Sequence, residues 1–166
     1  WWWLLKQPYN RGLLYKGSTI QPYSPAAGTG LSSHELNLPG CYRDVKDQTV
    51  TAQFTVLSGD EHPVIKKIHE AADQGFNDTY VLAWTTTPWT LPSNTALCVG
   101  NKIDYVAVES FNPYNGKPAI YLLAEARVSA YFKADGKDQP LEYNAGDKVV
   151  PWKVIASFKG QDLLEM

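Results

Sequence analysis

Apolar and polar residues alternate one by one between residues 50 and 56. The apolar positions are Val50, Ala52, Phe54 and Val56. Successive side chains of an extended chain point to opposite faces, so a period of two predicts a half-buried strand. The intervening Thr51, Gln53 and Thr55 are therefore expected on the solvent side.

The spacing changes to that of a helix directly after this strand. One helical face would hold Val64, Ile65, Ile68 and Ala72. Pro63 suits the first turn of a helix, and either Ser58 or Asp60 can cap it. Gly75 is the expected stop.

Other short apolar runs predict further strands, and turn residues separate them. Strands are expected at 79–85, 95–100, 104–110, 118–125 and 149–160, the last one broken or bulged at Pro151. A brief helix is expected within 125–133, and a helix-compatible stretch opens the chain until Pro8 and Gly12 limit it. Residues 18–30 should form an extended, looping segment, and Ser32 or Ser33 could cap a short helical turn after it.

This order of elements favours an α+β fold that is mostly β. Strands and helices do not alternate regularly around a glycine-rich phosphate loop, so a doubly wound nucleotide-binding sheet is not expected. We predict a small, closed, antiparallel-rich barrel with peripheral helices, formed by residues 1–166 as a single domain.

Composition supports a folded domain and narrows its class. The chain has 166 residues, of which 44% are hydrophobic and 19% charged, values ordinary for a globular protein. The net charge of -2 provides no global positive field that would attract nucleic acid. No apolar run is long enough to span a membrane, and the first residues lack the features of a signal peptide.

Neither the cysteines nor the histidines form a metal-ligand pattern. Cys41 and Cys98 could form one disulfide, but two buried free thiols are the expectation we prefer, as in a reducing compartment. His62 and His69 are seven residues apart on the predicted helix, but no third ligand is evident. We therefore predict a solvated helix face there, and no metal.

The most unusual stretch is AWTTTPWTLPSN, residues 83–94. Three threonines at the end of a strand, followed by Pro88, can be an ordinary strand terminus. They can also form a polar cradle, because hydroxyls donate and accept and the last backbone N–H groups of a strand are unpaired. Such a site would use neutral donors and a positioned water, since no charged residue lies within 83–94.

Four segments together resemble one family. AWTTTPWTLPSNTALCVG resembles the threonine-rich motif in the editing domain (the connective polypeptide) of isoleucyl-tRNA synthetase, a class I aminoacyl-tRNA synthetase. Agreement in order and spacing extends over nearly the whole chain, through GLLYKGSTIQPYSPAAGTGLSSHEL, YRDVKDQTVTAQF and VIASFKGQDLLEM. Leucyl and valyl enzymes typically carry an arginine after two threonines and an acidic residue after the proline. Thr87 and Trp89 stand at those positions here, so the pattern is similar to the isoleucyl type.

The resemblance implies the hydrolysis of valine wrongly attached to isoleucine tRNA, which keeps isoleucine incorporation accurate. One methylene provides too little discrimination for a single pocket, so a second pocket hydrolyses the smaller amino acid. The catalytic segment would be Thr85, Thr86 and Thr87. Trp89 and Thr90 would shape the side-chain sieve, and Asn94 would lie at the pocket rim.

The resemblance also implies what this chain lacks. The family's editing domain uses a Gly-Thr-Gly-Ile-Val-His run and a later aspartate that anchors the ammonium group of the substrate, and neither has a counterpart here. The Gly28-Thr29-Gly30 sequence lies in the segment leading into the domain and receives no catalytic role. We expect the chain to be a fragment of a larger cytoplasmic synthetase, truncated on its C-terminal side.

The partners implied are the 3′ end of a misacylated isoleucine tRNA and the remaining domains of the synthetase, with no membrane. No cofactor is expected in this fragment, because ATP and any zinc would belong to other domains of the parent enzyme. Two alternatives stay open. One is a non-catalytic small barrel that binds a tRNA end or a partner protein, and the other is a leucyl- or valyl-type editing domain.

Overall fold

The computed structural model describes residues 1–57, 62–164 and 166, and they divide into two compact units. The first unit is Trp1–Lys46 and the second is Asp47–Met166. The prediction that residues 1–166 act as one domain stays a prediction.

The first unit contains short elements with little burial. They are α1 (Trp2–Asn10), β1 (Tyr23–Ser24), β2 (Thr29–Gly30) and α2 (Ser33–Leu36). β1 and β2 pair antiparallel around a turn in which Gly28 has φ +66°, a conformation that glycine adopts without strain. Ser32 caps α2, because its hydroxyl accepts from the Glu35 N–H while the Glu35 carboxylate accepts from the Ser32 N–H at 2.6 Å. This capping box confirms one of the two predicted caps.

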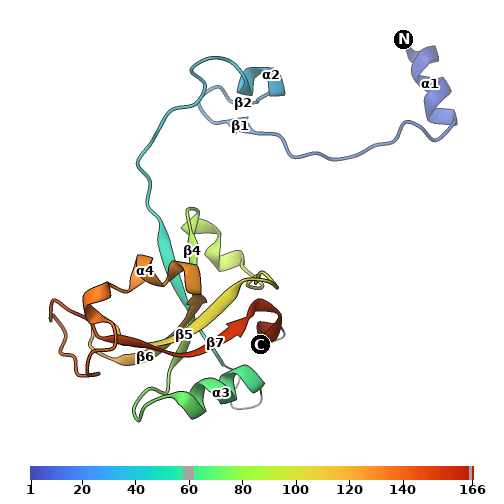
Figure 1. The fold of residues 1–166 in the computed structure, drawn as a ribbon. Helices are drawn as coiled ribbons and strands as arrows, with labels where there is room; N and C mark the ends of the chain where they lie inside the picture. Colours follow the sequence, from blue (N-terminus) through green and yellow to red (C-terminus); the bar gives the residue numbers. More distant parts are fainter. Residues whose placement is uncertain (58–61, 165) are drawn as a thin grey trace. The chain divides into compact units, whose positions relative to one another are not determined.

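The second unit contains a five-stranded sheet and the remaining helices (Figure 1). The strands are β3 (Val50–Thr55), β4 (Thr79–Thr85), β5 (Asp104–Phe111), β6 (Pro118–Ala124) and β7 (Trp152–Lys159). The α-helices are α3 (Pro63–Ala71) and α4 (Val128–Tyr131), and the 3₁₀ helices are η1 (Pro88–Ser93), η2 (Glu125–Arg127), η3 (Ala134–Gly136) and η4 (Gly160–Leu163).

The strand order is β3-β4-β6-β5-β7, and the sheet is mixed. β4 and β6 are parallel, whereas the other neighbouring pairs are antiparallel. The register between β5 and β7 shifts between Ala107 and Val108, which leaves Ile155 as an extra residue on β7. Pro151 lies just before β7, where its missing N–H costs no ladder hydrogen bond. The predicted irregularity in this strand is therefore a bulge further along.

Two apolar clusters fill the two faces of the sheet. On one face α3 contributes Val64, Ile65 and Ile68, which pack with sheet residues such as Ile120 and Leu122. The other face carries a second cluster, and Figure 1 shows α4 on the side of the sheet opposite α3. Its members are Val106, Val108, Ala119, Tyr121, Leu123 and Trp152.

The mostly-sheet α+β class is confirmed, together with the predicted strands that became β3 to β7. Among the residues that the structure describes, no pairing joins the outer strands β3 and β7, so closure into a barrel stays a prediction. The prediction of a strand at 95–100 is wrong, because this stretch has no strand partner. It begins just after Asn94, the residue that follows the 3₁₀ helix η1.

Other predictions concern the start of α3 and its histidines. Ser58 and Asp60, the proposed caps of α3, lie outside the described residues, and His62 Nδ1 accepts from the Val64 N–H at 3.3 Å. Both histidines of the predicted solvated face are half-buried, and each ring has a neighbour: His62 Nε2 lies 3.3 Å from the Leu164 carbonyl oxygen and His69 Nε2 lies 3.3 Å from Thr79 Oγ1.

The expectation of buried cysteines is wrong as well. Cys41 and Cys98 are free thiols, but both are exposed. Each lies in a segment without regular structure, so no layer of secondary structure covers it. The Cys41 thiol donates to the Leu36 carbonyl at 3.0 Å.

Candidate functional site

The threonine-rich segment forms a chain of hydrogen bonds where β4 ends. The Thr87 N–H donates to Thr85 Oγ1 at 3.0 Å, and the two hydroxyl oxygens lie 3.3 Å apart. Thr90 Oγ1 donates to the Thr87 carbonyl oxygen at 2.8 Å and lies 3.4 Å from Thr87 Oγ1. Three hydroxyls from residues close in sequence therefore share one network.

Local chain chemistry builds this arrangement. β4 stops at Thr85, and Pro88 begins η1, where a residue without an N–H costs no hydrogen bond. Thr87 lies between the two elements with φ -124° and ψ 64°. The tight turn folds Thr90 back, so that its N–H also donates to the Thr87 carbonyl at 3.0 Å.

The other predicted site residues lie in the same segment but outside this network. Thr86 is exposed, Trp89 is 66% exposed, and Asn94 follows η1 with its N–H donating to the Leu91 carbonyl. The structure thus joins Thr85, Thr87 and Thr90. It leaves the side chains of the others toward solvent.

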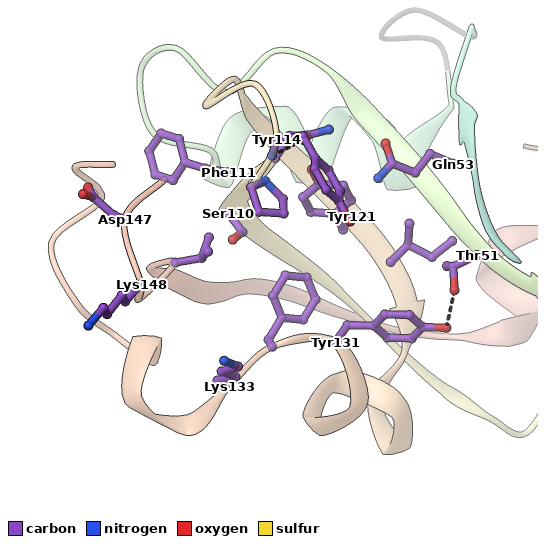
Figure 2. Close-up of a pocket in the computed structure, with 15 residues that line it drawn as sticks. Thr51, Gln53, Ser110, Phe111, Tyr114, Tyr121, Tyr131, Lys133, Asp147 and Lys148 are labelled. Carbon is purple, nitrogen blue, oxygen red and sulfur yellow. Dashed lines mark hydrogen bonds between the residues drawn. The ribbon is translucent and has the colours of Figure 1, made fainter. Parts of the chain in front are cut away.

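The larger cavity of the sheet unit lies on the face away from α3, and it has a volume of about 570 Å³ (Figure 2). At one end Thr51 Oγ1 and Tyr131 OH lie 3.2 Å apart, and Asp147 and Lys148 lie at the other. Its lining residues are Thr51, Gln53, Leu82, Ser110, Phe111, Asn112, Pro113, Tyr114, Tyr121, Tyr131, Phe132, Lys133, Asp147, Lys148 and Val150.

None of the sequence-predicted site residues lines this cavity. Thr51 and Gln53, which were expected on the solvent side of their strand, contribute to its wall, and Gln53 is exposed there. The alternation in β3 correctly separated two sets of side chains. It could not indicate that segments after residue 110 would form a cavity against the polar set.

A smaller cavity of about 250 Å³ lies closer to the threonine segment along the chain. It lies beside the end of the pairing between β4 and β6, whose last pair is Val81 with Leu122. Its walls are mainly apolar, with Arg127 as the charged member. The lining residues are Val81, Leu82, Ala83, Trp84, Leu97, Cys98, Val99, Tyr105, Leu123, Ala124, Arg127 and Tyr131.

Tyr121 is the buried ionisable residue of the larger cavity. Burial is the main cause that raises its pKa to about 12, and the neighbouring Tyr80 contributes. The two rings stack with centroids 6.1 Å apart. Like any tyrosine hydroxyl it is neutral at neutral pH and can donate a hydrogen bond.

A cluster of charged groups lies on the other face of the sheet. Glu109 is fully buried, and its Oε1 accepts from the Asp73 N–H at 2.5 Å. Its Oε2 lies 3.2 Å from Lys153 Nζ, which also donates to Asp73 Oδ2 at 2.6 Å. The angles at Oε2 do not make a hydrogen bond, but charge attraction does not require alignment. The hydrogen bond to Asp73 is the main cause that raises the pKa of Lys153.

The described residues contain no group of three or more His, Cys, Asp and Glu side chains placed to hold a metal ion. Within the same residues, every helix is too short or too polar to cross a membrane.

No family model matches the chain. Individual proteins do. The chain is 63% identical over 166 residues to an isoleucine–tRNA ligase of Bacteroides fragilis. This match covers 99% of the chain and 14% of that protein. It is 56% identical over 164 residues to the isoleucine–tRNA ligase of Porphyromonas gingivalis, and this match covers 98% of the chain and 14% of that protein. It is 44% identical over 162 residues to the isoleucine–tRNA ligase of Treponema denticola, and this match covers 98% of the chain and 13% of that protein.

The chain is therefore homologous to part of proteins that belong to the class of aminoacyl-tRNA ligases. Within that class its relatives are isoleucine–tRNA ligases, and the chain spans about a seventh of their length. The predicted resemblance to this enzyme is confirmed at that level.

Proposed function

We propose that the chain belongs to the editing domain of an isoleucine–tRNA ligase and helps to hydrolyse valine wrongly attached to isoleucine tRNA. The observation that carries the proposal is the linked hydroxyl network of Thr85, Thr87 and Thr90 at the end of β4. Homology to isoleucine–tRNA ligases over 99% of the chain supports the identity of the parent enzyme.

The reaction is an ester hydrolysis. Water adds to the ester carbonyl, the bond to the terminal ribose breaks, and free valine and the ribose hydroxyl are released. Threonine hydroxyls can accept a hydrogen bond from the attacking water and donate one to the developing oxyanion. Since Thr85 and Thr87 hold each other, their hydroxyls have less orientation to lose when a substrate binds.

Single variants of the parent enzyme test this role. Thr87→Ala removes the hydroxyl at the centre of the network, and we expect deacylation of valine-charged isoleucine tRNA to fall about ten- to a hundredfold. Thr95→Ala is the matched control, because Thr95 is exposed and lies outside the network. Isoleucine activation should be unchanged in both. Unchanged deacylation by Thr87→Ala would contradict the proposal.

The chain by itself should deacylate poorly. The resemblance implies an aspartate elsewhere in the parent that anchors the substrate ammonium group, and an ester that is not held in place reacts slowly. The measurement compares this chain with the parent enzyme at equal concentration on the same mischarged tRNA. Comparable rates would show that no further segment is required. A Thr87→Ala parent enzyme that deacylates normally but binds the tRNA more weakly would favour the alternative of a binding module.

A further inference from the structure

We propose that Tyr131 is a positioning residue for the threonine segment, which it holds in place through β3. This inference rests on the proposed function, because it concerns the same segment at the end of β4. Tyr131 is the last residue of α4, and its hydroxyl oxygen lies 3.2 Å from Thr51 Oγ1 on β3. Figure 2 shows the two side chains pointing toward each other.

The last part of β4 has a strand on one side alone. β4 pairs in parallel with β6 up to Val81, which lies opposite Leu122, and there this pairing ends. Residues 82–85 pair with β3, and they have no other strand pairing in the part of the chain that the structure describes. The stem that carries the threonine segment therefore depends on β3 for its position.

β3 is itself an edge strand of the sheet. It stands first in the order β3-β4-β6-β5-β7, so among the described residues its other side has no strand partner. A strand that is held by a single ladder of hydrogen bonds opens more easily than an inner strand. Thr51 is the second residue of β3 and pairs with Trp84, directly before Thr85. A further attachment at Thr51 therefore acts close to the threonine segment.

Tyr131 provides this attachment from a fixed backbone. Its neighbours Val128 and Phe132 pack against the apolar cluster on the face of the sheet away from α3. The ring centroids of Phe132 and Trp152 lie 5.6 Å apart, and the Trp152 indole N–H donates to the Lys133 carbonyl oxygen at 2.7 Å. The chain on both sides of Tyr131 is thus held to the sheet.

Tyr131 also spans the place where β4 and β6 separate. Its side chain contributes to the walls of both the larger and the smaller cavity, and so does Leu82 of β4. Because α4 follows β6 through η2, the contact with Thr51 connects the end of β6 to β3 across the part of β4 that β6 no longer pairs with. The contact provides a connection where the strand pairing has ended.

The effect of this contact should be local. Tyr131 is 39% exposed and Thr51 is half-buried, so water can partly replace the hydrogen bond and the whole fold loses little without it. The reaction is more sensitive, because a displacement of about 1 Å at a reacting centre can lower a rate by up to about a hundredfold. We therefore expect a change in the rate of deacylation without a comparable change in stability.

Deacylation of valine-charged isoleucine tRNA by variants of the parent enzyme tests the proposal. Tyr131→Phe and Thr51→Val each remove one hydroxyl and keep the shape of the side chain, and each should lower kcat about three- to tenfold with KM unchanged. The double variant should be no slower than the single ones, since all three lose the same contact. Thr51→Ser keeps the hydroxyl and should retain the rate. Tyr114→Phe and Thr55→Val are the matched controls, because both residues are exposed and lie outside this contact.

Hydrogen–deuterium exchange of the parent enzyme provides a readout that does not depend on activity. In Tyr131→Phe the peptide that contains residues 82–87 should exchange about three- to tenfold faster, because its stem opens more often. Peptides from β5 and the midpoint of thermal unfolding should change little. Unchanged exchange of residues 82–87 would overturn the proposal.

The outcomes separate this inference from the proposed function. Normal deacylation by Tyr131→Phe, together with slow deacylation by Thr87→Ala, would overturn the role of Tyr131 and leave the editing proposal standing. Normal deacylation by Thr87→Ala would contradict the editing proposal, and the exchange measurement would still decide whether Tyr131 holds the stem. A higher KM with kcat unchanged in Tyr131→Phe would also overturn the positioning role, because Tyr131 would then contact the substrate directly.

Discussion

Thr90 is held by its own turn, and this bears on its proposed part in the sieve. Its hydroxyl donates to the Thr87 carbonyl, so the methyl group is the part that remains to contact a substrate. A β-branched side chain is stiff about its first torsion and makes a firm stop. The rival is Trp89, whose ring is 66% exposed.

Thr90→Ala in the parent enzyme should admit isoleucine to the editing reaction. Removing the stop should lower the cost of one extra methylene by about 1 kcal/mol, or roughly fivefold in rate. Thr90→Ser should admit isoleucine as well, because it keeps the hydroxyl bonded to Thr87 and removes only the methyl. The measurement is deacylation of correctly charged isoleucyl-tRNA. If Trp89→Ala releases the correct product and Thr90→Ala does not, the tryptophan sets the size limit.

Tyr121 should make the chain lose stability at high pH. Its pKa in the folded chain is about 12, and an unfolded tyrosine titrates near 10. The folded state therefore holds this proton more tightly. The stabilisation is fully present below pH 10 and is lost as the pH rises through 12, by at most about 3 kcal/mol. Denaturant unfolding at several pH values checks this. Tyr121→Phe should give a shallower fall between pH 10 and 12, and equal slopes would contradict the expectation.

At the scale of elements, the Lys153 charge cluster connects β7, β5 and the turn after α3. Glu109 comes from β5, Lys153 from β7 and Asp73 from the turn. The buried carboxylate needs a neighbouring cation, because desolvation disfavours an uncompensated charge. Lys153 therefore matters for stability mainly because its removal would leave the buried Glu109 carboxylate without a neighbouring cation.

Lys153→Met should lower the free energy of unfolding by about 2 kcal/mol, less than for a fully buried pair because Lys153 is partly exposed. Lys66→Met is the control, since its pair with Glu70 spans 4.0 Å on the surface and should cost under about 0.5 kcal/mol. Adding Glu109→Leu to Lys153→Met should recover most of the loss. Chemical denaturation measures all three, and a double variant as unstable as the single one would show that the carboxylate is not the cause.

At the scale of the whole chain, the two units should differ in stability. Residues 1–46 include no buried residue, whereas residues 47–166 carry both apolar clusters. We expect a chain of residues 47–166 to unfold within about 3 °C of the full 166-residue chain. Calorimetry of the two checks this. A clearly lower midpoint would show that the first unit stabilises the sheet, as the single-domain prediction expects.

Several elements followed from the sequence alone, because the pattern of neighbouring residues decides them. The alternation at 50–56 predicted β3, and the spacing of Val64, Ile65 and Ile68 predicted the buried face of α3. The threonines followed by Pro88 predicted the end of β4. The family followed from the same segment, since its order of hydroxyls and prolines is unusual.

Tertiary structure decided what depends on segments far apart in the sequence. Nothing near β4 indicates that it pairs in parallel with β6, and nothing near Thr51 and Gln53 indicates the cavity that they line. The expected strand at 95–100 failed for the same reason, because a strand forms only where another chain segment accepts its hydrogen bonds. Sequence therefore determined the elements and the threonine turn, whereas only the packing of distant strands determined the cavities and the buried charges.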